Sequence, residues 1–207
     1  MFEFKFFRNM QYIVKYPKNY RAGEKYPTIL LLHGSGSRGT DARRLCKNDF
    51  FTVTEYMESF DFVTLAPMCH EDTWFDLWET LRAFALEIPD FEFCDAKRIY
   101  AMGPSMGGYA TWQLGMSLPW LFAAIVPICG GGMYWNAERL KNVPVWAFHG
   151  EKDTLVLPEE SEKMVAAVNA AGGSARLSLY PDVCHEVWLD VYSDEEVFAW
   201  LLSNAKK

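Results

Sequence analysis

The chain has 207 residues, 50% of them apolar and 16% aromatic, so it can bury one substantial core and is too apolar to be disordered. Its 27 acidic residues outnumber its 20 basic ones, and a net charge of -7 disfavours nucleic acid and membrane surfaces as partners. No apolar run is long enough to span a bilayer and no signal peptide is recognisable, so we expect a cytoplasmic protein. The 5 cysteines lack paired spacing, which predicts reduced thiols and no metal site.

Short apolar runs alternate with amphipathic stretches along the chain, as in a sheet with crossover helices. Residues 2–7 and 11–16 predict an antiparallel hairpin. The later runs are apolar throughout, which is typical of parallel strands covered on both faces; they are 28–32, 62–66, 98–102, 123–128, 145–148 and 176–180. Helical patterns cover 73–88, 158–171 and 194–202. We therefore expect residues 1–207 to form a single α/β domain with a mostly parallel sheet of about eight strands and no large lid or cap domain.

The segment Gly103-Pro104-Ser105-Met106-Gly107 lies between the predicted strand 98–102 and a helix-like stretch. Gly-x-Ser-x-Gly in this setting is the pattern of a nucleophile elbow, a turn so sharp that the serine is strained and its hydroxyl stands clear of the sheet. A Cβ at either glycine would collide with the adjoining strand or helix. The alternative interpretation is a tight structural turn with no chemical role.

Two further residues follow predicted strands in the order that a serine hydrolase needs. Asp153 comes just after 145–148, and His185 comes just after 176–180. Loops at the carboxyl ends of parallel strands open on one edge of the sheet, so these side chains can meet Ser105 there. The imidazole would take the serine proton, and the carboxylate would orient the imidazole. Three other acids could serve in place of Asp153, namely Glu151, Asp182 and Glu186.

The glycine-rich segment 32–39 predicts an oxyanion hole. It follows a strand and can present backbone N–H groups toward the elbow. We assign the two donors to the N–H groups of Ser35 and Met106, and we place Gly34 beside the substrate. A phosphate-binding loop is the competing interpretation, but no Lys-Ser/Thr pair follows the glycines. We expect His33 to brace this loop rather than to catalyse.

Four motifs together resemble the α/β-hydrolase superfamily, and within it the compact, lidless carboxylesterases, phospholipases and feruloyl esterases. They are Leu32-His33-Gly34-Ser35-Gly36-Ser37-Arg38-Gly39, Gly103-Pro104-Ser105-Met106-Gly107-Gly108, His149-Gly150-Glu151-Lys152-Asp153 and Cys184-His185. The resemblance implies an α/β-hydrolase fold, serine ester hydrolysis without a cofactor, and a triad of Ser105, Asp153 and His185. Trp74-Phe75-Asp76 also resembles a segment that lies near the pocket of thioesterase and carboxylesterase members. Ser35 departs from the family, since many members carry a larger apolar residue there.

Aromatic residues give the only indication of a substrate. Trp74, Trp135 and Trp188 lie in or beside loops at the predicted active edge, where they would suit an aryl or acyl group or a sugar ring. They could equally pack the loops. We expect a small-molecule ester substrate, either a small aryl or acyl ester or an acylated carbohydrate. Thioesters, lysophospholipids and peptides remain alternatives for the same triad, and a non-catalytic binding protein is a more distant one. The sequence leaves the oligomeric state open.

Overall fold

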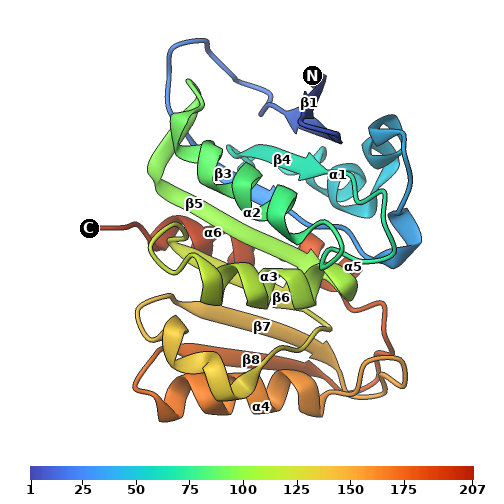
Figure 1. The fold of residues 1–207 in the computed structure, drawn as a ribbon, viewed down its shortest axis with the longest axis vertical. Helices are drawn as coiled ribbons and strands as arrows, with labels where there is room; N and C mark the ends of the chain where they lie inside the picture. Colours follow the sequence, from blue (N-terminus) through green and yellow to red (C-terminus); the bar gives the residue numbers. More distant parts are fainter.

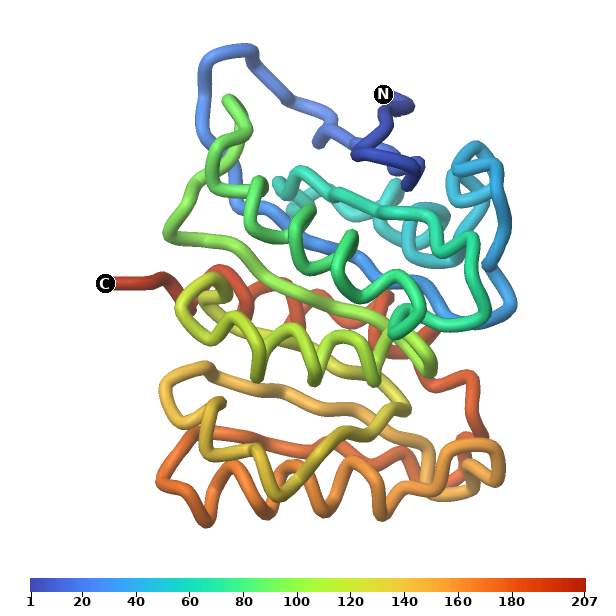
Figure 2. Tube along the Cα trace, viewed as in Figure 1, coloured from blue at the N-terminus to red at the C-terminus, as the bar shows by residue number.

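An eight-stranded sheet runs through the molecule and positions every other element (Figures 1 and 2). The computed structural model describes all residues from 1 to 207. The strands lie in the order β1-β2-β4-β3-β5-β6-β7-β8. Their bounds are β1 Phe2–Phe7, β2 Met10–Lys15, β3 Tyr26–Leu31, β4 Val63–Pro67, β5 Cys94–Pro104, β6 Ala124–Ile128, β7 Val145–Gly150 and β8 Ala175–Tyr180.

The strand pairing confirms the predicted mostly parallel α/β-hydrolase sheet. Strands β1 and β2 form an antiparallel hairpin in which Phe7 pairs with Met10. Strand β2 also runs antiparallel to β4, and all pairs from β4 through β8 are parallel. The hairpin turn is one residue tighter than predicted, because Arg8 adopts a positive φ of 54° and Met10 already belongs to the strand.

Helices cover both faces of the sheet. The α-helices are α1 Asp49–Thr54, α2 Trp78–Glu87, α3 Met106–Ser117, α4 Glu159–Ala170, α5 Trp188–Ser193 and α6 Glu195–Ser203, and the 3-10 helices are η1 Ser35–Ser37, η2 Ala42–Lys47, η3 Ile88–Asp90 and η4 Tyr134–Leu140. Helices α2, α3 and α4 supply one hydrophobic cluster, and α1, α5 and α6 supply a second. In Figure 1, α2 and α3 lie in front of the sheet and α5 and α6 lie behind it. None of the helices combines the length and apolar character that crossing a membrane requires.

One helix is shorter than its sequence pattern predicted. The apolar stripe suggested a helix over 73–88, but α2 begins only at Trp78. The carboxylate of Asp76 accepts hydrogen bonds from the backbone N–H and the hydroxyl of Thr73, and the Thr73 hydroxyl accepts one from the N–H of Phe75. These local side-chain bonds hold residues 73–76 in turns instead of helix. Residues 73–76 therefore stay outside the helix, and Trp74 reaches the His33 carbonyl just beyond the end of β3.

Candidate active site

Ser105 occupies a strained turn between β5 and α3. Its backbone has φ 55° and ψ −121°, a conformation that costs a non-glycine residue on the order of 1–3 kcal/mol. The turn is held because the Ser105 N–H donates to the Ile128 carbonyl of the neighbouring strand at 2.9 Å. The geometry agrees with the predicted elbow.

The two glycines of the elbow are required by close backbone approach. A Cβ on Gly103 would lie 2.3 Å from the Leu32 carbonyl oxygen, and one on Gly107 would lie 1.9 Å from the same oxygen. Both distances are well inside van der Waals contact, so any side chain at these positions would push α3 and β5 away from β3. The prediction that both positions exclude a Cβ is confirmed.

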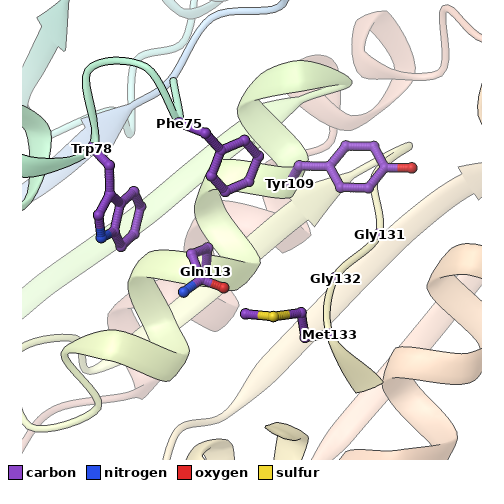
Figure 3. A pocket seen from close by; sticks show the side chains of 7 residues that line it. All are labelled: Phe75, Trp78, Tyr109, Gln113, Gly131, Gly132 and Met133. Atoms are coloured by element: carbon purple, nitrogen blue, oxygen red, sulfur yellow. The ribbon is translucent and has the colours of Figure 1, made fainter. Parts of the chain in front are cut away.

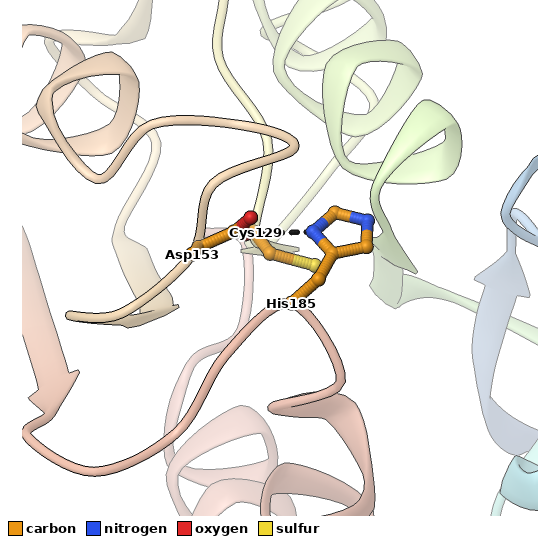
Figure 4. Close-up of side chains that lie close together, drawn as sticks. All are labelled: Cys129, Asp153 and His185. Atoms are coloured by element: carbon orange, nitrogen blue, oxygen red, sulfur yellow. Dashed lines mark hydrogen bonds and ion pairs between the residues drawn. The ribbon is translucent and has the colours of Figure 1, made fainter.

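The structure brings Ser105, His185 and Asp153 together at the carboxyl ends of β5, β7 and β8. The His185 Nε2 lies 2.9 Å from the Ser105 Oγ. Its Nδ1 lies 2.6 Å from the Asp153 Oδ2 (Figure 4). A carboxylate can only accept, so Nδ1–H donates to Asp153 and leaves the Nε2 lone pair facing the serine hydroxyl. This is the arrangement in which an imidazole can remove the serine proton.

Asp153 is held as a buried, ionised acceptor. Its Oδ1 accepts hydrogen bonds from the N–H groups of Leu155 and Val156 at 2.9 Å and 3.0 Å. Burial by itself would raise the pKa of Asp153, but the hydrogen bonds from His185 and from these two N–H groups outweigh it and lower the pKa below its usual value. The rival Asp182 points into solvent and pairs with Lys152 instead.

A second buried histidine stands behind the Asp153 carboxylate, and sequence reasoning gave it no role. The His149 Nε2 lies 3.2 Å from the Asp153 Oδ2 and 2.9 Å from the Val156 carbonyl. Its Nδ1 lies 2.7 Å from the Ser161 hydroxyl, which in turn lies 2.9 Å from the Gly130 carbonyl. The chain of polar groups fixes the Asp153 side chain against α4. The one available signal was the placement of His149 at the end of a fully apolar strand, four residues before Asp153.

The two residues predicted to supply the oxyanion donors, Ser35 and Met106, lie near the nucleophile. Met106 is the first residue of α3, so its N–H has no partner within the helix, and Ser35 opens the short helix η1. Ser35 and Ser105 line one cleft of about 280 Å³, together with Gly34. A Cβ on Gly34 would lie 3.6 Å from the Ser105 Cβ, which shows how near this loop runs to the nucleophile.

Trp74 does not line the substrate site, contrary to the expectation from sequence. Its side chain is fully buried, and its Nε1 donates to the His33 carbonyl at 3.0 Å. The His33 ring is buried as well: its Nδ1–H donates to the Gly34 carbonyl at 2.8 Å, and its Nε2 accepts from the Cys69 N–H at 3.0 Å. Burial lowers the pKa of His33 to about 4, so the ring stays neutral. Trp74 and His33 together brace the oxyanion loop.

The other two predicted tryptophans differ from each other. Trp188 lines the cleft of Ser105, packs edge-on against the His185 ring at 5.6 Å, and donates its Nε1–H to Asp49. Trp135 does not line this cleft: it is 72% exposed and packs only against the neighbouring Tyr134 ring. It sits on η4, whose apolar positions Ala137 and Leu140 face the core and turn Trp135 outward. The structure thus places Trp135 outside the cleft that contains Ser105.

A second cavity, of about 520 Å³, opens beside α3 and was not foreseen from the sequence (Figure 3). Its walls are Phe75, Trp78, Tyr109, Gln113, Gly131, Gly132 and Met133. Tyr109 and Gln113 follow Ser105 at four-residue steps, which places them on the helical face that starts at the nucleophile. That spacing could have identified both residues from the sequence.

The thiol of Cys129 lies beside the triad, and its sulfur, a carboxylate oxygen of Asp153 and a ring nitrogen of His185 are within 4.8 Å of one another (Figure 4). Burial raises the pKa of the Cys129 thiol, so the sulfur keeps its proton. Metals bind the thiolate, and Nδ1 of His185 already donates to Asp153. The three groups therefore do not fit a metal site; they form a hydrogen-bonded imidazole next to an uncharged thiol.

The comparison with protein families finds one match. The sequence model described as "Dienelactone hydrolase family" matches residues 73–192, which is more than half of the chain and includes Ser105, Asp153 and His185. A search of the curated proteins gives no match.

Solved structures similar to this chain include several esterases. A thermostable esterase has 30% sequence identity and a TM-score of 0.86, with 99% of this chain and 63% of that chain covered, so the chain spans less than two thirds of this relative. Est1E from Butyrivibrio proteoclasticus has 15% identity and a TM-score of 0.74, with 98% of both chains covered. A mutant feruloyl esterase module from Clostridium thermocellum, complexed with sinapinate, has 16% identity and a TM-score of 0.72, with 93% of this chain and 85% of that chain covered. The last two likenesses show a shared fold.

Proposed function

The chain belongs to the dienelactone hydrolase family, and we propose that it is a serine carboxylesterase. The family and the esterase relative both support an ester-cleaving hydrolase. The observation that carries the proposal is the bridge made by His185, whose two ring nitrogens lie 2.9 Å from the Ser105 hydroxyl and 2.6 Å from the Asp153 carboxylate. Each of the three groups has the neighbour that its proposed role requires.

The proposed first half-reaction acylates Ser105. The Oγ attacks the ester carbonyl carbon while His185 Nε2 takes the hydroxyl proton, and the carbonyl oxygen becomes an oxyanion held by the N–H groups of Ser35 and Met106. When the intermediate collapses, the bond to the alcohol oxygen breaks and Nε2–H returns the proton to that oxygen. An alcohol leaves, and the acyl group remains on Ser105.

The proposed second half-reaction frees the acid. His185 Nε2 takes a proton from water, the hydroxide oxygen attacks the acyl carbon, and the same two N–H groups hold the new oxyanion. The bond to Oγ then breaks, and Nε2–H returns the proton to Ser105. Asp153 stays ionised throughout and stabilises the positively charged ring.

The open site suits small aryl or acyl esters or acylated carbohydrates. We propose that no lid or cap domain covers Ser105; the short helix η4, the one helix between β6 and β7, supports this. We propose that residues of this single α/β domain supply every catalytic group that the reaction needs. Thioesters, lysophospholipids and peptides are the alternative substrates, and a protein that binds esters without cleaving them is the remaining alternative.

A fluorophosphonate probe tests the nucleophile directly. We expect stoichiometric labelling of wild type at the peptide that contains Ser105, and loss of labelling and of 4-nitrophenyl acetate hydrolysis in Ser105→Ala. Ser59→Ala is the matched control, because Ser59 is an exposed serine outside the site. Wild-type hydrolysis by Ser105→Ala would refute the assignment. A panel of acetyl, butyryl, thioester and peptide substrates then separates the alternatives.

A further inference from the structure

Ser105 lines one cleft, and a second cavity of different chemistry lies along α3, the helix that begins directly after Ser105. The cleft of about 280 Å³ includes Ser105 itself and His185, and its walls continue onto α1 and α5. The cavity of about 520 Å³ is walled by α3, by the residues before and at the start of α2, and by the loop after β6. Because α2 and α3 pack on one face of the sheet and α1 and α5 on the other, the two linings draw on helices from opposite faces of the sheet.

The larger cavity is apolar and built from flat rings. The Phe75 and Trp78 rings are stacked, with centroids 6.1 Å apart and planes at 29°. Figure 3 shows both rings facing the space that the Tyr109 ring and the Met133 thioether bound from other sides. Aromatic faces and a polarisable sulfur favour a planar, aromatic occupant, and the volume lies in the range of small-molecule sites.

The larger cavity is also at the right distance from the nucleophile. Tyr109 begins one helical turn beyond Ser105, and its N–H donates to the Ser105 carbonyl at 3.0 Å. Gln113 follows one turn later. Four residues of α-helix rise about 6 Å, so the cavity extends from about 6 Å to about 12 Å along α3 from the nucleophile. A short linker between a carbonyl on Ser105 and an aromatic ring spans that gap.

The smaller cleft is polar. Its walls include the side chains of Ser37, Asn48, Asp49 and Glu186, and Trp188 supplies one aromatic face. Asp49 and Glu186 are exposed to solvent at its mouth. Such a surface suits a polyhydroxylic group. The carboxylates, the amide and the hydroxyl can form hydrogen bonds with its hydroxyl groups, and the indole face can pack against it.

The position of His185 decides which part of an ester enters which space. In acylation the proton on Nε2 must pass to the oxygen of the departing alcohol, so the alcohol lies on the side of the imidazole. His185 belongs to the polar cleft, and no residue of its loop lines the apolar cavity. The acyl group therefore extends away from the imidazole, toward Trp78 and Tyr109.

We propose that the cavity of Phe75, Trp78, Tyr109 and Met133 binds an aromatic acyl group and that the cleft of Asp49, Glu186 and Trp188 receives a polar, hydroxyl-rich alcohol. The substrate class is thus an ester of an aromatic carboxylic acid with a polyol or sugar. The assignment of the two sides rests on the proposed function, because it uses the direction of proton transfer from His185.

Binding to an inactive protein tests the acyl side separately from catalysis. In Ser105→Ala, we expect calorimetric titration to show that methyl cinnamate binds at least tenfold more tightly than methyl acetate. Adding Trp78→Ala should remove about tenfold of that preference, which corresponds to about 1.4 kcal/mol. Trp120→Ala is the matched control, since Trp120 is an exposed tryptophan beyond the far end of α3. Equal binding of the two esters to Ser105→Ala would overturn the proposal.

Kinetics on the active enzyme test both sides at once. Esters of one alcohol with acetyl and cinnamoyl groups measure acyl selectivity as a ratio of kcat/KM, and cinnamoyl esters of methanol and glycerol measure alcohol selectivity. Trp78→Ala should lower the acyl ratio by about tenfold and also change deacylation, because the acyl group is still bound then. Glu186→Ala should change the alcohol ratio more than it changes deacylation of the cinnamoyl enzyme, since the alcohol has left by then. Met133→Trp, which fills the cavity without removing packing, should lower the acyl ratio as well.

The outcomes distinguish this inference from the proposed function. Suppose that Ser105→Ala binds methyl cinnamate tightly and through Trp78, but wild type hydrolyses no ester. This result would refute the esterase proposal and support the aromatic cavity. Hydrolysis by wild type with an acyl ratio that Trp78→Ala and Met133→Trp leave unchanged would overturn the cavity assignment and support the esterase. An effect of Trp78→Ala on the alcohol ratio alone would show that the two sides are reversed, and would also overturn it.

Discussion

His33 makes the stability of the protein depend on pH in a narrow and predictable window. Its Nε2 accepts a hydrogen bond from the Cys69 N–H, so a proton on Nε2 would break that bond and set two donors against each other. Burial, the larger cause, and the nearby Arg38 charge lower the pKa of His33 from 6.5 to about 4, although the bond to the Gly34 carbonyl opposes them. The folded protein therefore keeps the ring neutral where the unfolded chain protonates it.

The sign and the size follow from that difference. Between pH 6.5 and about pH 4 the unfolded chain binds more protons at His33 than the folded protein does, so stability falls as the pH falls and levels off below about pH 4. One pKa unit corresponds to about 1.4 kcal/mol, and the shift of His33 therefore corresponds to a loss of about 3 kcal/mol across the window. Asp153, whose lowered pKa starts from 3.8, acts in the same direction only at lower pH.

Urea unfolding at a series of pH values measures this loss, with His33→Gln as the comparison. A glutamine oxygen can accept from the Cys69 N–H but does not titrate, so the variant should be less sensitive to pH in the window. We expect the free energy of unfolding of wild type to fall by about 3 kcal/mol more than that of His33→Gln between pH 6.5 and pH 4. Parallel curves for the two proteins would refute the claim that His33 is kept neutral.

Three further substitutions test the site and its supports. Asp153→Asn should lower kcat by about 10⁴ with little change in KM, because an amide can favour the wrong imidazole tautomer; steady-state kinetics check this, and an active variant would transfer the acid role to another carboxylate. Gly107→Ala should cost several kcal/mol, about what severe overpacking costs, because its Cβ would lie 1.9 Å from the Leu32 oxygen, and a wild-type melting temperature would contradict the close approach. Ser161→Ala leaves His149 without a partner at Nδ1 and should lower the free energy of unfolding by about 1–3 kcal/mol in urea unfolding. Ser161→Thr, which keeps a hydroxyl, should lose less stability than Ser161→Ala. Equal stability of the Ser161→Ala variant and wild type would show that this link is dispensable.

Much of the site could be predicted from the sequence because its chemistry follows from local patterns and topology. Ser105, Asp153 and His185 each stand at or just beyond the end of an apolar run, and parallel strands bring such ends to one edge whatever the details of packing. The glycines at 103 and 107 indicate that the backbone there passes too close to a neighbouring segment to leave room for a Cβ. These features need only the order and the character of the strands.

The tertiary structure alone decided which aromatic residues line the cavities and which residue packs behind the Asp153 carboxylate. Trp74 and Trp78 are four residues apart on what looked like one helix, yet Trp74 turns inward to the His33 carbonyl and Trp78 lines a cavity. The orientation of Trp74 depends on a hydrogen bond to a residue 41 positions away in the sequence. A periodic pattern of apolar residues does not identify such a distant partner. His149 likewise lies near the end of β7, and only the packing of α4 places the Ser161 hydroxyl against its ring. A sequence pattern shows that a side chain is buried, but the neighbour that covers it is chosen only when distant segments pack together.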